Sequence, residues 1–300
     1  MLHVPVLLKE TIDLLAPTTD GIFVDATLGL GGHTREILER SKPGGRVIGF
    51  DRDAAALTEA RQNLAPYGDR ISFLQKNYAE IKEGLLENNI KQVDGLLLDL
   101  GLSSLQLDNS GRGFTFKGNG PLDMRMDSRD KITAADLLNN EAENELADIF
   151  YYYGEERHSR NIAARIVAQR QKVRFETVDQ LAEIVAQAIP KRFQPKKIHV
   201  ATKVFQALRI AVNNELGNLA TILNDAVDVL KPGGKFLVIS FHSLEDRMVK
   251  RKFRKDPAFK VVTKKPVVPT EAERRLNPRA RSAKLRAAIR LDRPSSEEKK

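Results

Sequence analysis

A glycine-rich segment and an acidic residue are spaced as in a site for an adenosine-containing cofactor. Residues 25–33 (DATLGLGGH) follow a short apolar run and precede a segment with helical periodicity. Glycine lets the backbone turn sharply at such a junction and lets a ligand approach closely. Asp51 ends the next apolar run, where a carboxylate can accept both ribose hydroxyls of a nucleoside. Together they predict a nucleoside-cofactor site, although each alone is also typical of a tight turn or a helix cap.

Two classes of cofactor fit this pattern. A nicotinamide dinucleotide needs its pyrophosphate at a helix N-terminus, whereas the methionine end of S-adenosylmethionine presents an amine and a carboxylate that suit Asp25 and exposed loop amides. A Lys231-Pro-Gly-Gly turn before the apolar run 235–241 is a further feature of class I methyltransferases. These features favour S-adenosylmethionine and leave a nicotinamide dehydrogenase as the rival enzyme class. The five histidines show no helical metal-ligand spacing, so we expect no metal site.

The elements that must position these residues alternate as in an open α/β sheet. Near-continuous apolar runs suit parallel strands that are buried on both faces, and strands that alternate with helices indicate a doubly wound sheet. Residues 259–262 and 283–291 are candidates for a final antiparallel pair. The expected parallel strands lie at 21–27, 46–50, 71–74, 94–98 and 235–241, with helices at 33–40, 54–64, 201–216 and 219–230.

The alternation stops after Asp99, because residues 103–130 are rich in Gly, Asn, Asp, Ser and Arg and residues 133–197 have the pattern of successive helices. We therefore predict an α/β fold, a class I Rossmann-like S-adenosylmethionine-dependent methyltransferase sheet with an inserted all-helical domain. The predicted boundaries are 1–104 for the first part of the methyltransferase domain, 105–198 for a helical insert that recognises substrate, 199–294 for the second part, and 295–300 for a disordered tail.

Composition limits the compartment and the available chemistry. No apolar run approaches the ~20 residues of a membrane span, and the N-terminus lacks the layout of a signal peptide. We therefore expect a cytoplasmic protein with no membrane partner. The chain contains no cysteine, which excludes disulfides and thiolate metal sites.

The positive charge is concentrated at the C-terminal end. Residues 250–300 contain 18 Lys and Arg against 6 Asp and Glu, a surplus of +12 that leaves the first 249 residues at −3. Such a surplus can follow a phosphate backbone, because each neutralised phosphate releases counterions, although many basic tails are simply solvated. The charge therefore favours a nucleic-acid partner.

Six segments resemble the signature blocks of the RsmH (MraW) family, and the resemblance runs nearly end to end. That family methylates the exocyclic N4 of a cytidine in the decoding region of bacterial 16S ribosomal RNA, so the resemblance implies the same activity here. The segments are 24–34 (VDATLGLGGHT), 94–104 (DGLLLDLGLSS), 111–116 (GRGFTF), 120–127 (GPLDMRMD), 205–210 (FQALRI) and 239–247 (ISFHSLEDR). By the family's pattern, S-adenosylmethionine contacts Gly31, Gly32, His33, Asp51, Tyr78, Asp99 and Gln106.

The chemistry of cytosine N4 points to the loop after the fourth strand. Its lone pair is delocalised into the ring, so a catalyst should align the amine with the sulfonium methyl group and accept its hydrogens. Asp99, with Ser103 or Ser104, follows this strand at the sheet edge where ligands of open α/β folds bind. We predict these as catalytic residues, while the family pattern also assigns Asp99 to the cofactor, so the division between its two roles stays open.

Basic residues accompany an apolar stripe in the expected insert, so one face can pack while the other meets phosphate. A charged, solvent-exposed helix has the same pattern. The predicted partner is 16S ribosomal RNA or the small ribosomal subunit; dimerisation stays open, and a non-catalytic ribosome-assembly factor with a vestigial cofactor site is the alternative. The basic residues are Arg157, Arg160, Arg165, Arg170, Lys172 and Arg174.

Overall fold

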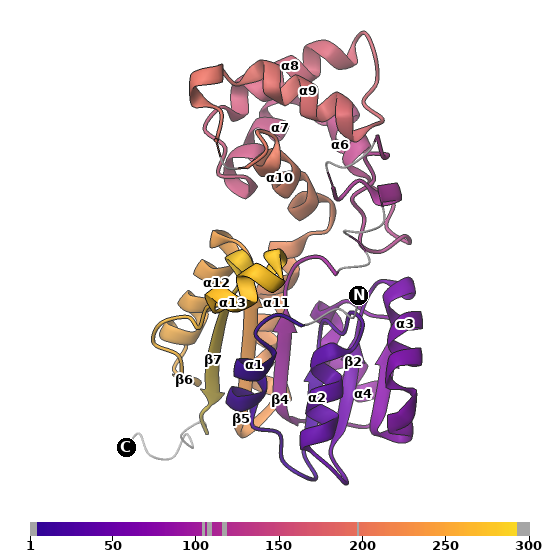
Figure 1. Ribbon diagram of the computed structural model, residues 1–300, viewed down its shortest axis with the longest axis vertical. Helices are drawn as coiled ribbons and strands as arrows, with labels where there is room; N and C mark the ends of the chain where they lie inside the picture. The colour runs from indigo at the N-terminus through magenta and orange to yellow at the C-terminus, as the bar shows by residue number, and fades with distance from the viewer. Residues whose placement is uncertain (1–4, 104–105, 107–109, 116–118, 197, 293–300) are drawn as a thin grey trace, which may run out of the picture. The chain divides into compact units, whose positions relative to one another are not determined.

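The computed structural model describes residues 5–103, 106, 110–115, 119–196 and 198–292. Contacts within the chain divide it into two units (Figure 1). The first unit contains residues 1–103 and 216–300, and the second contains residues 104–215. The predicted catalytic residue Ser104 and the predicted tail at 295–300 lie outside the described residues.

The first unit is built on a seven-stranded sheet with the order β3-β2-β1-β4-β5-β7-β6. Strands β1 to β5 pair in parallel, and β7 pairs antiparallel with both β5 and β6. The class I Rossmann-like sheet is confirmed, as is its final antiparallel pair. The strands are β1 (Ile22–Asp25), β2 (Arg46–Phe50), β3 (Ile71–Leu74), β4 (Val93–Asp99), β5 (Leu230–Ser240), β6 (Phe259–Val261) and β7 (Lys284–Arg290).

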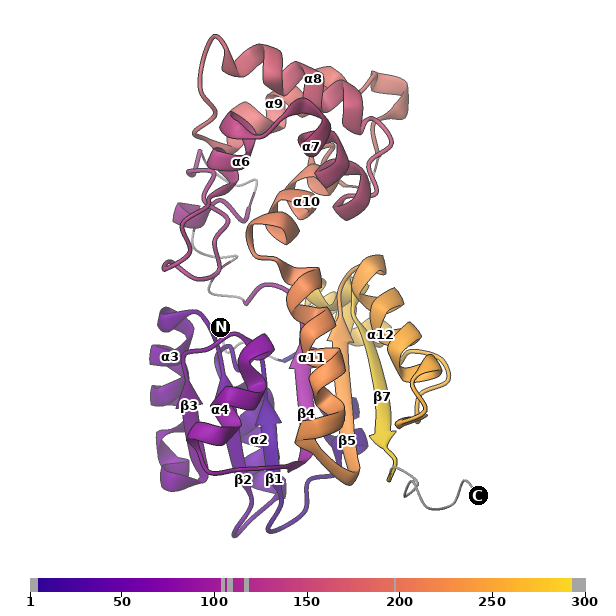
Figure 2. The same cartoon turned by 180° about the vertical axis from the view of Figure 1, so that it is seen from behind.

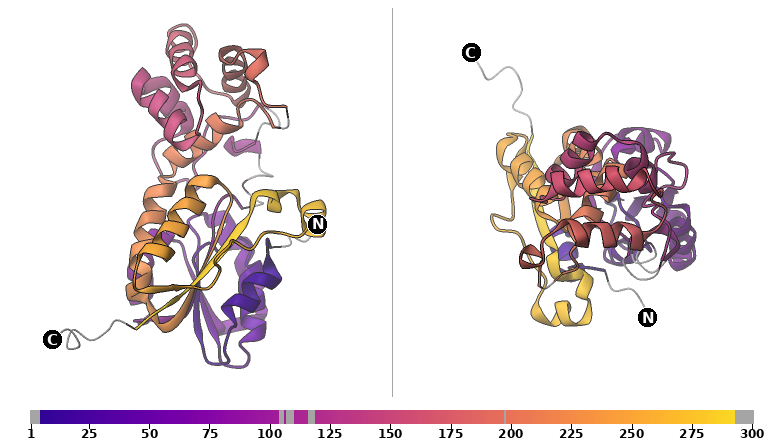
Figure 3. Two further views of the ribbon diagram at one scale, coloured as in Figure 1. Left: turned by 90° about the vertical axis from the view of Figure 1, so that its left-hand side faces the viewer. Right: turned by 90° about the horizontal axis from the view of Figure 1, so that it is seen from above.

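Helices cover both faces of this sheet (Figure 3). One face packs against α1 (Leu8–Leu15), α2 (Gly32–Arg40) and α3 (Ala54–Leu64). The other, seen in Figure 2, packs against α4 (Ile81–Glu87), α11 (Glu215–Val229) and α12 (Ser243–Lys255). The shorter helices are α13 (Glu271–Leu276) and the 3-10 turns η1 (Ala65–Arg70), η2 (Tyr78–Glu80) and η6 (Pro278–Ser282).

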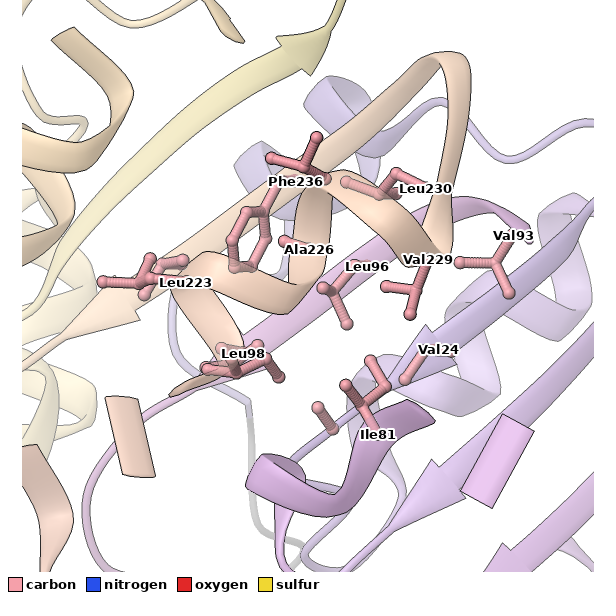
Figure 4. Packing of buried hydrophobic residues seen from close by; sticks show 14 of the residues in the cluster. Val24, Ile81, Val93, Leu96, Leu98, Leu223, Ala226, Val229, Leu230 and Phe236 are labelled. Atoms are coloured by element: carbon pink, nitrogen blue, oxygen red, sulfur yellow. The ribbon is translucent and has the colours of Figure 1, made fainter. Parts of the chain in front are cut away.

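Strand β4 shows why its apolar run is continuous. Successive side chains of a strand point to opposite faces of the sheet. Leu96 and Leu98 belong to the cluster under α4 and α11 (Figure 4), whereas Leu97 belongs to the cluster under α1 and α2. A strand that is buried on both faces carries Asp99 to the carboxyl edge of the sheet.

The second unit is helical and has its own apolar core, which includes Phe150, Ile162 and Leu181. Helix α10 buries Val204 and Leu208 in this core, and the unit ends at Glu215. The predicted return to the sheet at residue 199 is earlier than the boundary in the structure. The elements are η3 (Ser110–Arg112), α6 (Ala134–Asn140), α7 (Glu143–Asp148), the π-helix η4 (Ile149–Tyr153), α8 (Ser159–Arg170), α9 (Val178–Ala188), η5 (Lys191–Phe193) and α10 (Thr202–Val212).

The role of Arg170 differs from the one that its charge suggested. Its guanidinium Nη1 donates hydrogen bonds to the carbonyl oxygens of Leu138, at 2.9 Å, and Glu141, at 2.7 Å. These carbonyls lie at the end of α6, where helix geometry leaves acceptors unpaired. Arg170 therefore stabilises the second unit from within.

Among the described residues, no helix has the length and apolar character needed to span a bilayer.

Replacing Phe236 with alanine should destabilise the first unit. The Phe236 ring is fully buried (Figure 4), and its centroid lies 5.3 Å from that of Phe253 in an edge-to-face contact. Loss of a buried phenylalanine typically costs about 3–5 kcal/mol. Urea unfolding followed by circular dichroism should show this loss, while Leu276→Ala, at a side chain that is 88% exposed, should stay within about 0.5 kcal/mol of the parent chain. Equal stabilities of the two variants would contradict the packing described.

Candidate active site

The turn between β1 and α2 is built on glycines that cannot be replaced without strain. Gly29 and Gly31 have φ angles of +53° and +83°, a region that L side chains rarely adopt. A Cβ atom on Gly31 would lie 2.7 Å from Leu64 Cδ1, and one on Gly32 would lie 2.2 Å from Pro5 Cγ. The backbone of this turn is therefore packed from beneath, and its other side can approach a ligand closely.

Asp25 ends β1 and is fully buried. Thr34 Oγ1 donates a hydrogen bond of 2.7 Å to Asp25 Oδ2, and the Thr27 amide donates one of 3.3 Å to Oδ1. Burial raises the pKa of Asp25 to about 6, with a further contribution from the charge of Asp51. The carboxylate fixes the glycine turn from below, and its contact with a methionine amine stays a prediction.

Asp51 follows the last residue of β2 and joins this strand to the glycine turn. Its Oδ2 accepts the Gly29 amide at 2.8 Å, and its Oδ1 accepts the Asp53 amide at 2.9 Å. Burial raises the pKa of Asp51 to about 6, although both amide hydrogen bonds lower it. Each carboxylate oxygen can accept more than one hydrogen bond, so the two amides orient Asp51 and still leave acceptor capacity for ribose hydroxyls.

Asp99 ends β4 and carries the least satisfied acceptor of this edge. Its main-chain amide donates to Thr27 Oγ1 at 2.6 Å. Its Oδ1 atom is buried and has no hydrogen-bond partner within the described ranges. Burial raises the pKa of Asp99 well above its ordinary value, and the negative charges of Asp25 and Glu245 raise it further. A buried oxygen of this kind suits a hydrogen-bond donor supplied by a ligand.

His33 lies beside Asp99 and is itself buried. Its Nε2 lies 3.1 Å from the carbonyl oxygen of Val6, a pairing that places the proton of the neutral ring on Nε2 because the carbonyl can only accept. The other ring nitrogen, Nδ1, then has a lone pair and lies 3.7 Å from Asp99 Oδ2. A proton on Asp99 would make this contact favourable.

The structure brings most of the predicted site residues to one edge of the first unit. Tyr78 begins η2 and is partly buried against the apolar cluster that includes Val24 and Leu98. Ser103 is the last residue of this part of the unit, whereas Gln106 is buried and belongs to the second unit. The residues gathered at the sheet edge are Asp25, Gly31, Gly32, His33, Asp51 and Asp99.

Two threonines of the glycine segment were not predicted as site residues. Thr27 donates its amide to Asp25 and accepts the amide of Asp99 through its hydroxyl, and Thr34 donates its hydroxyl to Asp25. Both position the carboxylates through hydrogen bonds. In the sequence, the signal for this positioning role is two hydroxyl side chains in a segment that lies between two strands with acidic residues at their ends.

These features define the class of the protein. The parallel sheet places three features at its carboxyl edge: a glycine turn with positive φ angles after β1, a carboxylate after β2, and at the end of β4 a carboxylate with one oxygen that has no hydrogen-bond partner among the described residues. Open α/β sheets bind their ligands at this edge, and the antiparallel β7 between β5 and β6 gives the sheet of class I methyltransferases.

Comparison with known proteins identifies the family. The model of the MraW methylase family matches residues 1–291, and the chain belongs to this family. A protein of Desulfotalea psychrophila named ribosomal RNA small subunit methyltransferase H is 58% identical over 97% of this chain and 98% of its own length. Proteins of the same name from Cyanothece sp. and Geotalea uraniireducens are 52% and 48% identical, over 97% and 96% of this chain and 95% and 98% of their own lengths. The predicted class of enzyme, a methyltransferase that uses S-adenosylmethionine, is confirmed.

Replacing Asp25 with asparagine should change how stability depends on pH. A carboxyl group whose pKa rises from 3.8 to about 6 on folding contributes stability below pH 4 that is lost as the pH rises to about 6. The loss is about 3 kcal/mol. Thermal unfolding without cofactor should therefore show the melting temperature of Asp25→Asn rising relative to the parent between pH 4 and pH 7. If the melting temperatures of Asp25→Asn and the parent changed in parallel with pH, Asp25 would not be buried as an ionised group.

Proposed function

We propose that this protein transfers a methyl group from S-adenosylmethionine to the exocyclic N4 of a cytidine in the decoding region of 16S ribosomal RNA. The observation that carries the proposal is the 58% identity, over nearly the full length of both chains, with a protein named ribosomal RNA small subunit methyltransferase H. The substrate is the RNA itself or the small ribosomal subunit that contains it.

The residues at the sheet edge fit the proposed cofactor. Gly31 and Gly32 pack closely against Leu64 and Pro5, which leaves the other side of this backbone to a ligand, and the first turn of α2 offers amide groups to a carboxylate. Asp51, oriented by the amides of Gly29 and Asp53, accepts ribose hydroxyls. When bound, S-adenosylmethionine supplies an activated methyl group on sulfur.

Asp99 is the residue we assign to the exocyclic amine. The buried Oδ1 atom, which has no partner within the described ranges, accepts an N–H of the amine and orients the nitrogen lone pair. N4 must release one proton when it gains a methyl group, and Asp99 can take this proton. Burial raises the pKa of Asp99, which makes the carboxylate a stronger base than an ordinary aspartate.

Ser103 and Ser104 complete the proposed catalytic set as further acceptors in the loop after β4. Gln106 and Tyr78 complete the proposed cofactor contacts, together with Gly31, Gly32, His33, Asp51 and Asp25. A non-catalytic ribosome-assembly factor would have no need for a polar, ionisable side chain at the position of Asp99. A buried carboxylate oxygen with no hydrogen-bond partner among the described residues is costly, and its presence is therefore an argument for catalysis.

The replacement Asp99→Asn should abolish most of the methyl transfer while the chain stays folded. An amide cannot take the amine proton at Oδ1, and loss of a positioned proton acceptor typically costs a factor of about 10²–10⁴ in rate. Single-turnover transfer of a labelled methyl group to small ribosomal subunits measures the rate, and calorimetry measures the affinity for S-adenosylmethionine. Asp69→Asn, at an exposed surface position, is the control and should match the parent in both.

The outcome separates the two proposed roles of Asp99. A lower rate with unchanged cofactor affinity assigns Asp99 to the amine, whereas a parallel loss of both assigns it to the cofactor.

Mass mapping of 16S ribosomal RNA from cells that lack the protein should show one unmethylated cytidine N4. Complete methylation in those cells would refute the proposed function.

A further inference from the structure

An exposed aromatic ring stands in a basic part of the second unit. Phe193 ends the 3-10 turn η5, after α9, and its side chain is 55% exposed. The centroid of its ring lies 5.4 Å from that of His158, with an angle of 37° between the planes. The guanidinium carbon of Arg192 lies 4.8 Å from the Phe193 centroid. The ring therefore has a cationic neighbour and an aromatic neighbour, and more than half of its side chain is exposed.

The backbone around this ring is held in place by amide side chains. Gln194 Nε2 donates hydrogen bonds of 2.9 Å to the carbonyl oxygens of Ala186 and Ile189, which fixes η5 to the end of α9. Asn161, on α8, donates its side-chain amide to the Ala188 carbonyl oxygen. These bonds connect the helix that follows His158 to the helix that precedes Phe193. The aromatic ring is consequently presented on a fixed support, which lowers the entropy that binding must overcome.

The two segments that carry Phe193 and His158 are basic, although the buried carboxylate of Glu156 accepts the His158 amide at 2.8 Å. Residues 157–160 and 190–196 contain five Lys and Arg and no Asp or Glu. Within the described part of the chain, none of these five cations forms an ion pair, whereas Lys82 and Lys231 in the first unit both pair with aspartates. Unpaired cations attract a polyanion because the released counterions gain entropy. The five are Arg157, Arg160, Lys191, Arg192 and Lys196.

We infer that Phe193, with His158 and Arg192, forms a stacking site for one unpaired nucleotide of the RNA substrate, separate from the methyl-transfer site. The nucleobase lies against the Phe193 ring, and Arg157, Arg160 and Lys191 face the adjoining phosphates. Unpaired bases stack on aromatic side chains in RNA recognition, and a protein partner of apolar character would gain nothing from the five cations. The inference rests on the proposed function, because it takes RNA as the substrate.

The test compares three single variants in binding to a single-stranded fragment of small-subunit ribosomal RNA, measured by fluorescence anisotropy. Phe193→Ala should weaken binding by roughly five-fold to a hundred-fold, the range expected for loss of one stacked base. Phe193→Trp, which keeps an aromatic face, should stay within about three-fold of the parent. Val173→Ala is the matched control, because Val173 is also 55% exposed in the same unit and should leave binding unchanged. Affinity for S-adenosylmethionine should be unchanged in all three variants.

A second measurement does not depend on the folding of the Phe193 variants. The double variant Arg157→Gln/Arg160→Gln should lower the dependence of log Kd on log salt concentration by about one for each phosphate that is no longer neutralised. Any one of three results would overturn the stacking site. These are an unchanged salt dependence, equal binding by Phe193→Ala and the parent, and equal losses of affinity in the alanine and tryptophan variants. A parent chain that neither binds nor methylates ribosomal RNA would instead refute the proposed function, so the two failures are distinguishable.

Discussion

Three carboxylates at the ends of three adjacent strands set the electrostatic conditions of the first unit. Asp25 and Asp99 end β1 and β4, and Asp51 follows β2 directly. Burial raises the pKa of each, and the charges of Asp25 and Asp51 add to the effect at their neighbours. The fold therefore holds acidic groups where they are least stable as anions. Such an arrangement persists only when packing elsewhere compensates for it, which the two apolar clusters on either side of the sheet provide.

The hydrogen bonds within the glycine segment decide which of these carboxylates remains available. Asp25 is held by Thr34 and Thr27, and Asp51 is oriented by two amides, whereas Asp99 Oδ1 receives no hydrogen bond from the described residues. The same Thr27 accepts the Asp99 amide through its hydroxyl. One short turn thus anchors the first carboxylate and positions the backbone of the last. This difference between equivalent strand ends is the basis for the separate roles in binding and in proton transfer that we propose for them.

The sheet was predictable because its strands are buried on both faces and its helices begin and end at recognisable residues, as at α3, which ends just before Pro66. The boundary near residue 199 was not, because the apolar stripe of α10 shows that one face is buried but not in which core. Charge alone likewise could not distinguish Arg170, which caps α6, from Arg157 and Arg160. At the site, residue types predicted the carboxylates and the turn. The unequal hydrogen bonding of Asp25 and Asp99 depends on three-dimensional contacts that no spacing shows.

The same carboxylates limit where RNA affinity can arise. An edge that gathers Asp25, Asp51 and Asp99 repels phosphate, so the sheet edge is suited to a neutral base and poorly suited to the backbone that carries it. Affinity for a polyanion must then come from cations that are not already neutralised by acidic neighbours. In the second unit the segments 157–160 and 190–196 meet this condition and include an exposed aromatic ring. The basic C-terminal residues of the first unit can add to this affinity, so acidic chemistry at the sheet edge calls for basic recognition away from that edge.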